Sequence, residues 1–282
     1  MRILLQFLLS SCALLQAAPE VRHVVMPKGP EMQRAELYVW QPPRQKARGV
    51  MVFCPGHNGS GEGFVRDEGW QRFATDNKLA LCGLSFASEM EVTKDGRGYS
   101  RAERGSGELL LEGLEKVLHD PRLPLFLYGY SAGARFTTSF LAWKPDRVAM
   151  WCASGVGTWP PLPAEPARTP VPQGIVACGE NDAACYWSSL HYFQSGRERD
   201  YPWTWISLEG LGHGYSDKLD RFVIHYFSVL MGAREKGTGR ACFDISTKRP
   251  MDRDPGKEFR IFAAPLPADE KLIRHWTSIH HP

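Results

Sequence analysis

The sequence has no marked excess of charge of either sign. Its 34 Lys and Arg residues face 31 Asp and Glu residues, which leaves a formal net charge of +3, and neither a basic run nor an acidic tail concentrates that charge. Domains that bind nucleic acid or an anionic membrane surface normally carry a basic patch. The charge balance therefore argues against a nucleic-acid partner, and we expect the partner to be small or uncharged.

Long apolar runs and closely spaced cysteine pairs are lacking as well. Beyond the N-terminal stretch, no segment approaches the roughly 18 uninterrupted apolar residues that indicate a membrane-spanning helix. None of the seven cysteines forms the CxxC spacing typical of zinc sites. Hydrophobic residues still make up 43% of the chain, which is ordinary for a packed domain. We expect a folded protein with no stable membrane span, no metal and no cofactor.

The N-terminal residues 1–18 have the pattern of a signal peptide. Met1-Arg2 supplies a positive end, residues 3–15 are mostly apolar, and Ala17-Ala18-Pro19 closes the segment with small residues. Secretion or a periplasmic location is therefore predicted. Leu9-Ser10-Ser11-Cys12 resembles a lipoprotein box, so lipid attachment at Cys12 is the alternative.

Removal of that segment would leave six cysteines, an even number that invites disulfides in an oxidising compartment. Four of them lie in or at the end of short apolar runs, where cysteine behaves as a small apolar residue. These four are Cys54, Cys82, Cys152 and Cys178. One bridge among Cys178, Cys185 and Cys242 stays open at this point.

From residue 36 onward, short apolar runs alternate with helical stretches. Such alternation predicts an α/β fold with a mostly parallel central sheet and helices on both faces, here in one domain over 19–231. Residues 21–26 are expected to pair with 36–40 in an opening hairpin. The tail, 232–282, is polar with only 259–263 resembling a strand, and we expect it to pack on the same domain. The later strands are expected at 49–54, 79–86, 125–128, 148–153, 174–178 and 204–208, and the helices at 64–77, 108–119, 134–143, 186–194 and 217–231.

A candidate nucleophile lies between a strand and a helix. Gly129-Tyr130-Ser131-Ala132-Gly133 follows the expected strand 125–128 and precedes the expected helix 134–143, the context in which GxSxG forms a nucleophile elbow. A turn this tight strains the serine backbone and leaves no room for side chains two residues away. Ser131 would thus stand exposed at the start of the helix.

A serine hydroxyl needs a histidine base and a carboxylate to orient that base. His213, in Gly212-His213-Gly214, follows the last expected strand and precedes the last helix, which places it at the carboxyl edge of the sheet. The acid is expected just after the strand 174–178, where Glu180 and Asp182 lie. We prefer Asp182, because a chain leaving the strand needs a few residues to turn back toward the histidine.

Acyl transfer also needs N–H donors aimed at the developing oxyanion. The backbone N–H of Ala132, directly after the nucleophile, is one candidate. The glycine-rich turn that begins at Pro55-Gly56-His57 after the strand 49–54 offers the other, and we assign it to the N–H of His57.

The elbow, Asp182 and His213 in the order Ser, Asp, His, and the Pro-Gly-His turn together resemble the α/β-hydrolase superfamily. Within it the chain is similar to secreted esterases of the feruloyl esterase, polyhydroxybutyrate depolymerase and dienelactone hydrolase kinds. The resemblance covers roughly 36–231. Only the Pro-rich connector 159–172 separates two neighbouring strands between Ser131 and Asp182, so no large lid domain is expected.

This resemblance implies a serine hydrolase that cleaves a small-molecule or polymer-attached carboxylic ester through an acyl-enzyme. Two alternatives remain at this point. One is a serine peptidase of the same fold. The other is a hydrolase fold that has lost catalysis and serves as a binding module.

Overall fold

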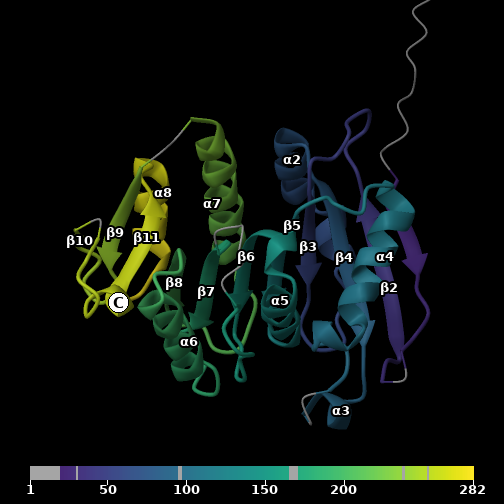
Figure 1. Cartoon of the computed structure of the whole chain (residues 1–282), viewed down its shortest axis with the longest axis horizontal. Helices are drawn as coiled ribbons and strands as arrows, with labels where there is room; N and C mark the ends of the chain where they lie inside the picture. The colour runs from purple at the N-terminus through teal and green to yellow at the C-terminus, as the bar shows by residue number, and fades with distance from the viewer. Residues whose placement is uncertain (1–19, 30, 95–96, 165–170, 237–238, 253) are drawn as a thin grey trace, which may run out of the picture.

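The computed structural model describes residues 20–29, 31–94, 97–164, 171–236, 239–252 and 254–282. The expected signal peptide, the expected cleavage site and Cys12 lie outside these residues, as does part of the Pro-rich connector. An eight-stranded sheet in the order β1-β2-β4-β3-β5-β6-β7-β8 forms the centre of the molecule, as Figure 1 shows.

Six of these strands run parallel, in the order β4-β3-β5-β6-β7-β8. Strand β2 is antiparallel to β4, and β1 is antiparallel to β2, so the opening hairpin and the mostly parallel sheet are both confirmed. The strands are β1 (Arg22–Val25), β2 (Arg34–Trp40), β3 (Val50–Cys54), β4 (Ala80–Ala87), β5 (Leu125–Tyr130), β6 (Val148–Ser154), β7 (Gln173–Gly179) and β8 (Trp203–Leu208).

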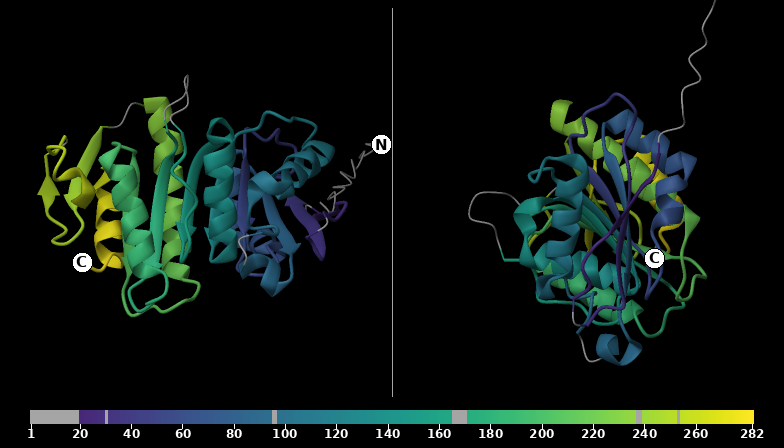
Figure 2. Two further views of the ribbon diagram at one scale, coloured as in Figure 1. Left: turned by 60° about the horizontal axis from the view of Figure 1, so that its bottom comes forward. Right: turned by 90° about the vertical axis from the view of Figure 1, so that its right-hand side faces the viewer.

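Helices cover both faces of the sheet, as the two views of Figure 2 show. This is why β3, β4, β6 and β8 are buried at every position and consist mostly of apolar residues. Helices α2 and α7 contact each other on one face, and α4, α5 and α6 lie on the other. The helices of the main sheet are α1 (Glu62–Arg66), α2 (Glu68–Asn77), α3 (Met90–Lys94), α4 (Ser106–Leu118), α5 (Ala132–Trp143), α6 (Tyr186–Glu198) and α7 (Asp217–Lys236), with short 3-10 turns η1 (Ala102–Arg104) and η2 (Pro145–Arg147).

The single helix expected over 64–77 is divided into α1 and α2. Asp67 between them has an extended backbone, with φ −71° and ψ 127°, and its side chain accepts a hydrogen bond from the N–H of Trp70. An aspartate that caps a new helix in this way ends the previous one. The connection between β4 and α4 contains α3 and η1.

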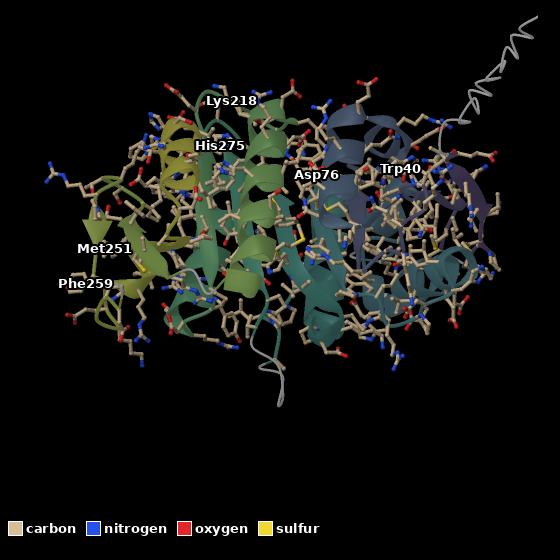
Figure 3. All side chains as sticks on the ribbon, turned by 90° about the horizontal axis from the view of Figure 1, so that it is seen from above. Trp40, Asp76, Lys218, Met251, Phe259 and His275 are labelled. Atoms are coloured by element: carbon tan, nitrogen blue, oxygen red, sulfur yellow. The ribbon has the colours of Figure 1, made fainter. Side chains whose placement is uncertain are left out.

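The tail holds more structure than the sequence analysis predicted. Strands β9 (Arg240–Asp244), β10 (Pro250–Met251) and β11 (Ala263–Pro267) form a second sheet, and α8 (Glu270–Ile279) follows it. The prediction of a strand at 259–263 is wrong. Most of this segment forms the 3-10 turn η3 (Arg260–Phe262), and β11 begins only at Ala263. Figure 3 shows Met251 and Phe259 at the tail end of the molecule and Trp40 toward the other end.

The tail packs against β8 through buried hydrogen bonds. The indole N–H of Trp276 donates to the Trp205 carbonyl at 3.0 Å. His280 is only 2% exposed. Its Nδ1 accepts the Ser207 N–H at 3.0 Å, and its Nε2 lies 2.7 Å from the Ile245 carbonyl. These two bonds require a neutral imidazole with its proton on Nε2, because a proton on Nδ1 would face the N–H of Ser207. The boundary between a hydrolase domain at 19–231 and a tail at 232–282 stays a prediction.

Burial lowers the pKa of His280 to about 4. A histidine whose pKa is lowered by folding contributes stability that is full above its unfolded pKa near 6.5 and is lost as pH falls through the folded value. We expect His280→Gln to remove up to about 3 kcal/mol of the stability difference between pH 7 and pH 4. Urea unfolding of both proteins at several pH values measures this. The matched control is His191→Gln, which replaces an exposed histidine of α6. If His280→Gln unfolds with the same pH dependence as the wild-type protein, the assignment is contradicted.

Candidate active site

Ser131 lies on a strained turn between β5 and α5. Its backbone has φ 54° and ψ −122°, a conformation that residues other than glycine rarely adopt. The Ser131 N–H donates to the Ser154 carbonyl at 2.9 Å, which holds the turn against the neighbouring strand. The sharp turn directs the serine out of the sheet at the carboxyl ends of the strands, as the GxSxG context predicts.

The two glycines of the motif are required by close backbone approach. A Cβ at Gly129 would collide with the carbonyl oxygen of Gly133, where α5 begins. A Cβ at Gly133 would collide with the carbonyls of Cys54 and Pro55 at the end of β3. The elbow can therefore form only where both positions lack a side chain.

His213 lies between Ser131 and Asp182. Its Nε2 is 2.9 Å from the Ser131 Oγ, and its Nδ1 is 2.7 Å from Asp182 Oδ2. The Asp182 carboxylate can only accept a hydrogen bond, so Nδ1 of His213 carries the hydrogen and donates it, and Nε2 accepts from the serine hydroxyl. The Asp182 side chain is 4% exposed and that of His213 44% exposed, so the acid is shielded while the base is open to solvent.

Glu180, the alternative acid, has different contacts. Its Oε2 accepts the N–H of Gly210 at 2.9 Å, and its Oε1 pairs with Nδ1 of His281 at 3.3 Å. These contacts join the loop after β7 to the loop after β8 and to the tail. The structure therefore brings Asp182, and not Glu180, to the histidine.

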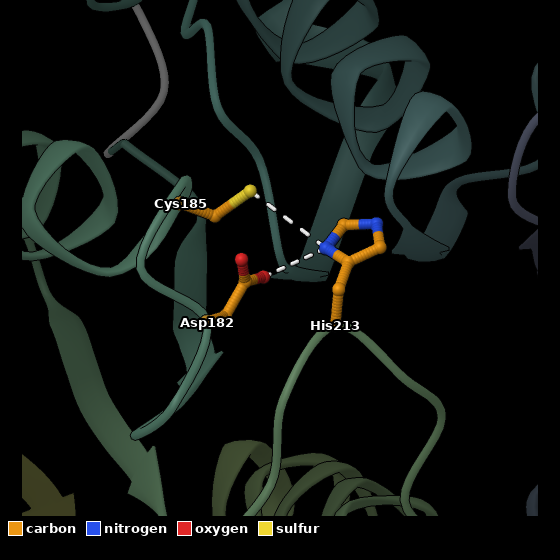
Figure 4. A group of neighbouring side chains, drawn as sticks. All are labelled: Asp182, Cys185 and His213. Atoms are coloured by element: carbon orange, nitrogen blue, oxygen red, sulfur yellow. Dashed lines mark hydrogen bonds and ion pairs between the residues drawn. The ribbon is translucent and has the colours of Figure 1, made fainter.

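Two thiols lie beside this pair of loops, and the sequence analysis did not place them there. Cys185 Sγ is 3.7 Å from Nδ1 of His213, as Figure 4 shows, and Cys178 Sγ is 3.9 Å from Asp182 Oδ2. Burial raises the pKa of each thiol to about 12. The six cysteines of the described residues form no disulfide. Asp182 and Cys185 are joined by a turn in which the Cys185 N–H donates to the Asp182 carbonyl, and this i, i+3 spacing is the signal that could have found the thiol.

The turn after β3 lies beside the nucleophile. A Cβ at Gly56 would be 3.7 Å from the Ser131 Cβ. The N–H of Gly56 donates to the Tyr215 hydroxyl and that of Asn58 to the Tyr99 hydroxyl, each at 3.0 Å. These two N–H groups are therefore engaged, and His57 lies between them.

The other expected donor, the N–H of Ala132, belongs to the first residue of α5. An N–H at this position has no acceptor within its own helix. The positive end of the helix dipole adds to its attraction for a developing negative charge. Ala132 and the turn around His57 thus flank Ser131 from two elements.

Tyr215 is a site residue that the sequence analysis missed. It lies two residues after His213, its hydroxyl accepts the Gly56 N–H, and its ring centroid is 4.2 Å from that of Tyr130. It therefore ties the histidine loop to the turn after β3. No local pattern marks it, because the contact joins residues 159 positions apart.

A surface hollow of about 880 Å³ lies elsewhere. Pro124, Pro145 and Pro202 line it near the amino ends of the parallel strands. Ser131, Asp182 and His213 lie at the opposite, carboxyl ends of these strands. Within the residues that the structure describes, no helix has the length and apolar character needed to cross a membrane.

No protein-family model and no curated protein sequence matches the chain. Solved structures do resemble it. An S-formylglutathione hydrolase from Agrobacterium tumefaciens matches with a TM-score of 0.54 at 12% identity, over 74% of this chain and 94% of that one. A ferulic acid esterase from Anaeromyces mucronatus matches with 0.53 at 15%, over 70% and 85%. An esterase from Pyrobaculum calidifontis matches with 0.53 at 13%, over 77% and 85%.

At these identities the likeness concerns the fold. The strand order, the helices on both faces and these matches confirm the α/β-hydrolase fold that the sequence resemblance implied. Between Ser131 and Asp182 the described residues add only α5, η2, β6 and β7 with their connections, and no large lid domain.

We expect Gly133→Ala to lower the free energy of unfolding by at least about 2 kcal/mol, because the added methyl group meets two backbone carbonyls that cannot move aside. Urea unfolding checks this. Gly232→Ala is the control, since a Cβ there meets nothing within 4 Å and alanine is the better helix former in α7. Wild-type stability in Gly133→Ala would contradict the close approach.

Proposed function

We propose that the protein is a serine hydrolase that cleaves a carboxylic ester through an acyl-enzyme. Ser131 is the nucleophile, His213 the general base and Asp182 the residue that orients the base. One observation carries the proposal: Asp182, His213 and Ser131 form an unbroken chain of hydrogen bonds that ends on a strained serine.

In the first step, Ser131 Oγ attacks the ester carbonyl while its proton passes to Nε2 of His213. The imidazolium that forms is stabilised by the buried carboxylate of Asp182, which keeps its negative charge. His213 then gives the proton to the departing alcohol, and the acyl group stays on Ser131. A water molecule, deprotonated by the same Nε2, attacks the acyl-enzyme, and His213 returns that proton to Ser131 Oγ as the acid is released.

The negative charge on the carbonyl oxygen needs donors on the far side of Ser131. We assign the backbone N–H groups of Ala132 and His57 to this role. Support comes from the position of Ala132 at the start of α5 and from the closeness of the turn after β3 to Ser131, since a Cβ at Gly56 would be 3.7 Å from the Ser131 Cβ. Such donors are typically worth a few kcal/mol each in the transition state.

The exposure of His213 and the absence of a large lid among the described residues favour a small or polymer-attached ester. We propose that the protein is secreted or periplasmic, on the basis of its N-terminal sequence, with a lipid anchor on Cys12 as the alternative. The binding-module alternative is less well supported, since such a domain has no need to keep Ser131 and His213 aligned. A peptidase of this fold would use the same triad.

A fluorophosphonate probe tests the class of the protein. We expect it to label the wild-type chain and to leave Ser131→Ala unlabelled, since only an activated serine reacts with it. A screen of p-nitrophenyl esters, aromatic esters, acetylated sugars and short peptides then separates esterase from peptidase. A folded wild-type protein that takes up no label would contradict the proposal and favour a binding module.

Substitution of the two acids tests the assignment of roles. We expect Asp182→Asn to lower kcat by about three to four orders of magnitude with little change in KM, because the orienter acts as imidazolium charge develops. Glu180→Gln is the matched control, because it removes a carboxylate charge two positions from Asp182. We expect it to lower kcat far less. Steady-state kinetics on the best ester of the screen decides, and a reversal of the two effects would remove Asp182 from the triad.

A further inference from the structure

The side chain of His213 and two side chains next to its Nδ1 atom have the composition of a metal site. Asp182, Cys185 and His213 place a carboxylate oxygen, a sulfur and a ring nitrogen within 4.8 Å of one another, as Figure 4 shows. Thiolate, imidazole and carboxylate are the ligands of Zn²⁺ in proteins. The sequence analysis expected no metal, because no pair of cysteines has the CxxC spacing typical of zinc sites.

We propose that Asp182, Cys185 and His213 form an inhibitory site for a thiophilic divalent cation such as Zn²⁺. The site itself depends only on the three side chains. Its inhibitory effect rests on the proposed function, because it requires His213 to act as a base.

The distances fit such an ion with a small adjustment. Bonds of about 2.3 Å to sulfur and about 2.0 Å to nitrogen, at a tetrahedral angle, place sulfur and nitrogen about 3.6 Å apart. Cys185 Sγ and His213 Nδ1 are 3.7 Å apart. Nitrogen and oxygen ligands would lie about 3.3 Å apart by the same geometry, whereas Nδ1 and Asp182 Oδ2 are 2.7 Å apart. The carboxylate would therefore withdraw by roughly 0.6 Å to admit the ion.

The proton balance explains why binding would inhibit. The ion takes the place of the proton on Nδ1, and a neutral imidazole then carries its proton on Nε2. Nε2 becomes a donor and can no longer accept the proton of Ser131. Cys185 loses its thiol proton to solvent, so one proton is released for each ion bound, and no group is oxidised or reduced.

Only the thiolate form of Cys185 binds the metal, so the ion must displace the thiol proton. Affinity should therefore rise with pH. Access is from the side of His213, the exposed member of the three, because Asp182 is 4% and Cys185 5% exposed. Gly155 lies on this approach, since a Cβ there would be 3.5 Å from the His213 ring and 3.6 Å from Asp182 Oδ2.

The site can be tested without catalysis by titrating the Ser131→Ala protein with Co²⁺. We expect about one equivalent to bind, with the near-ultraviolet absorption of a cobalt thiolate, and Zn²⁺ to displace it. In the same background, Cys185→Ala and Cys185→Ser should lose this absorption, and Cys178→Ala should keep it. The serine variant preserves side-chain size, and a thermal melt shows which variants are folded. Absence of the absorption in folded Ser131→Ala protein, or its persistence in either Cys185 variant, would overturn the proposal.

A second arm measures ester hydrolysis against Zn²⁺ concentration, each variant being normalised to its own metal-free rate. We expect inhibition that EDTA reverses, with a half-inhibiting concentration at least tenfold higher in Cys185→Ser than in Cys178→Ala. Equal sensitivity of the two variants would contradict the inhibitory site and leave the esterase proposal standing. Cobalt binding through Cys185 in a protein that hydrolyses no ester would support the metal site and contradict the esterase proposal.

Discussion

The approach of Gly133 to the carbonyl groups of Cys54 and Pro55 is the contact on which the site depends. It presses the start of α5 against the end of β3, and the chain between β5 and α5 must turn so sharply that Ser131 takes a positive φ. The same contact brings the turn around His57 beside the nucleophile. A single backbone approach thus sets both the direction of Ser131 and the position of the proposed oxyanion donors.

The acid and the base are positioned by a different set of contacts. The Glu180 N–H donates to the Leu208 carbonyl at 3.0 Å and the Asn181 N–H to the Leu211 carbonyl at 2.8 Å, so the loops after β7 and β8 run together as they leave the sheet. The Glu180 side chain adds Gly210 and His281 to this arrangement. Because Asp182 and His213 lie on these two loops, their separation is held by backbone hydrogen bonds and does not depend on the ion pair between them alone.

Much of this arrangement could be predicted from sequence, because its signals are local. A strand buried on both faces is a run of apolar residues, and a serine between two glycines after such a run indicates an elbow. The order of strands then implied that Asp182 and His213 follow neighbouring strands, and the carboxyl ends of parallel strands meet at one edge.

The remaining features depend on contacts between distant residues. Tyr215 reaches Gly56 and Cys185 reaches His213 only in the folded chain. Helix α8 did have a local signal in Leu272, Trp276 and Ile279, which share one buried face, and in Asp269, whose side chain caps the helix. No local signal predicted that α8 packs on β8, because neither segment alone has a sequence pattern that indicates the buried contact of Trp276 with Trp205.

The contacts of the tail also bear on the order in which the chain is synthesised. The backbone turn at Ser131 can form once β6 has been made, since the Ser154 carbonyl accepts the Ser131 N–H. The acid and base loops come later, and the final contacts to them are made by His280 and His281, which bind Ser207 and Glu180. Because domains fold as units while the ribosome works from the N-terminus, a chain under synthesis would hold a formed nucleophile turn with an incompletely supported base. Asp182 and His213 would therefore gain their full support only after residues 280 and 281 have been made.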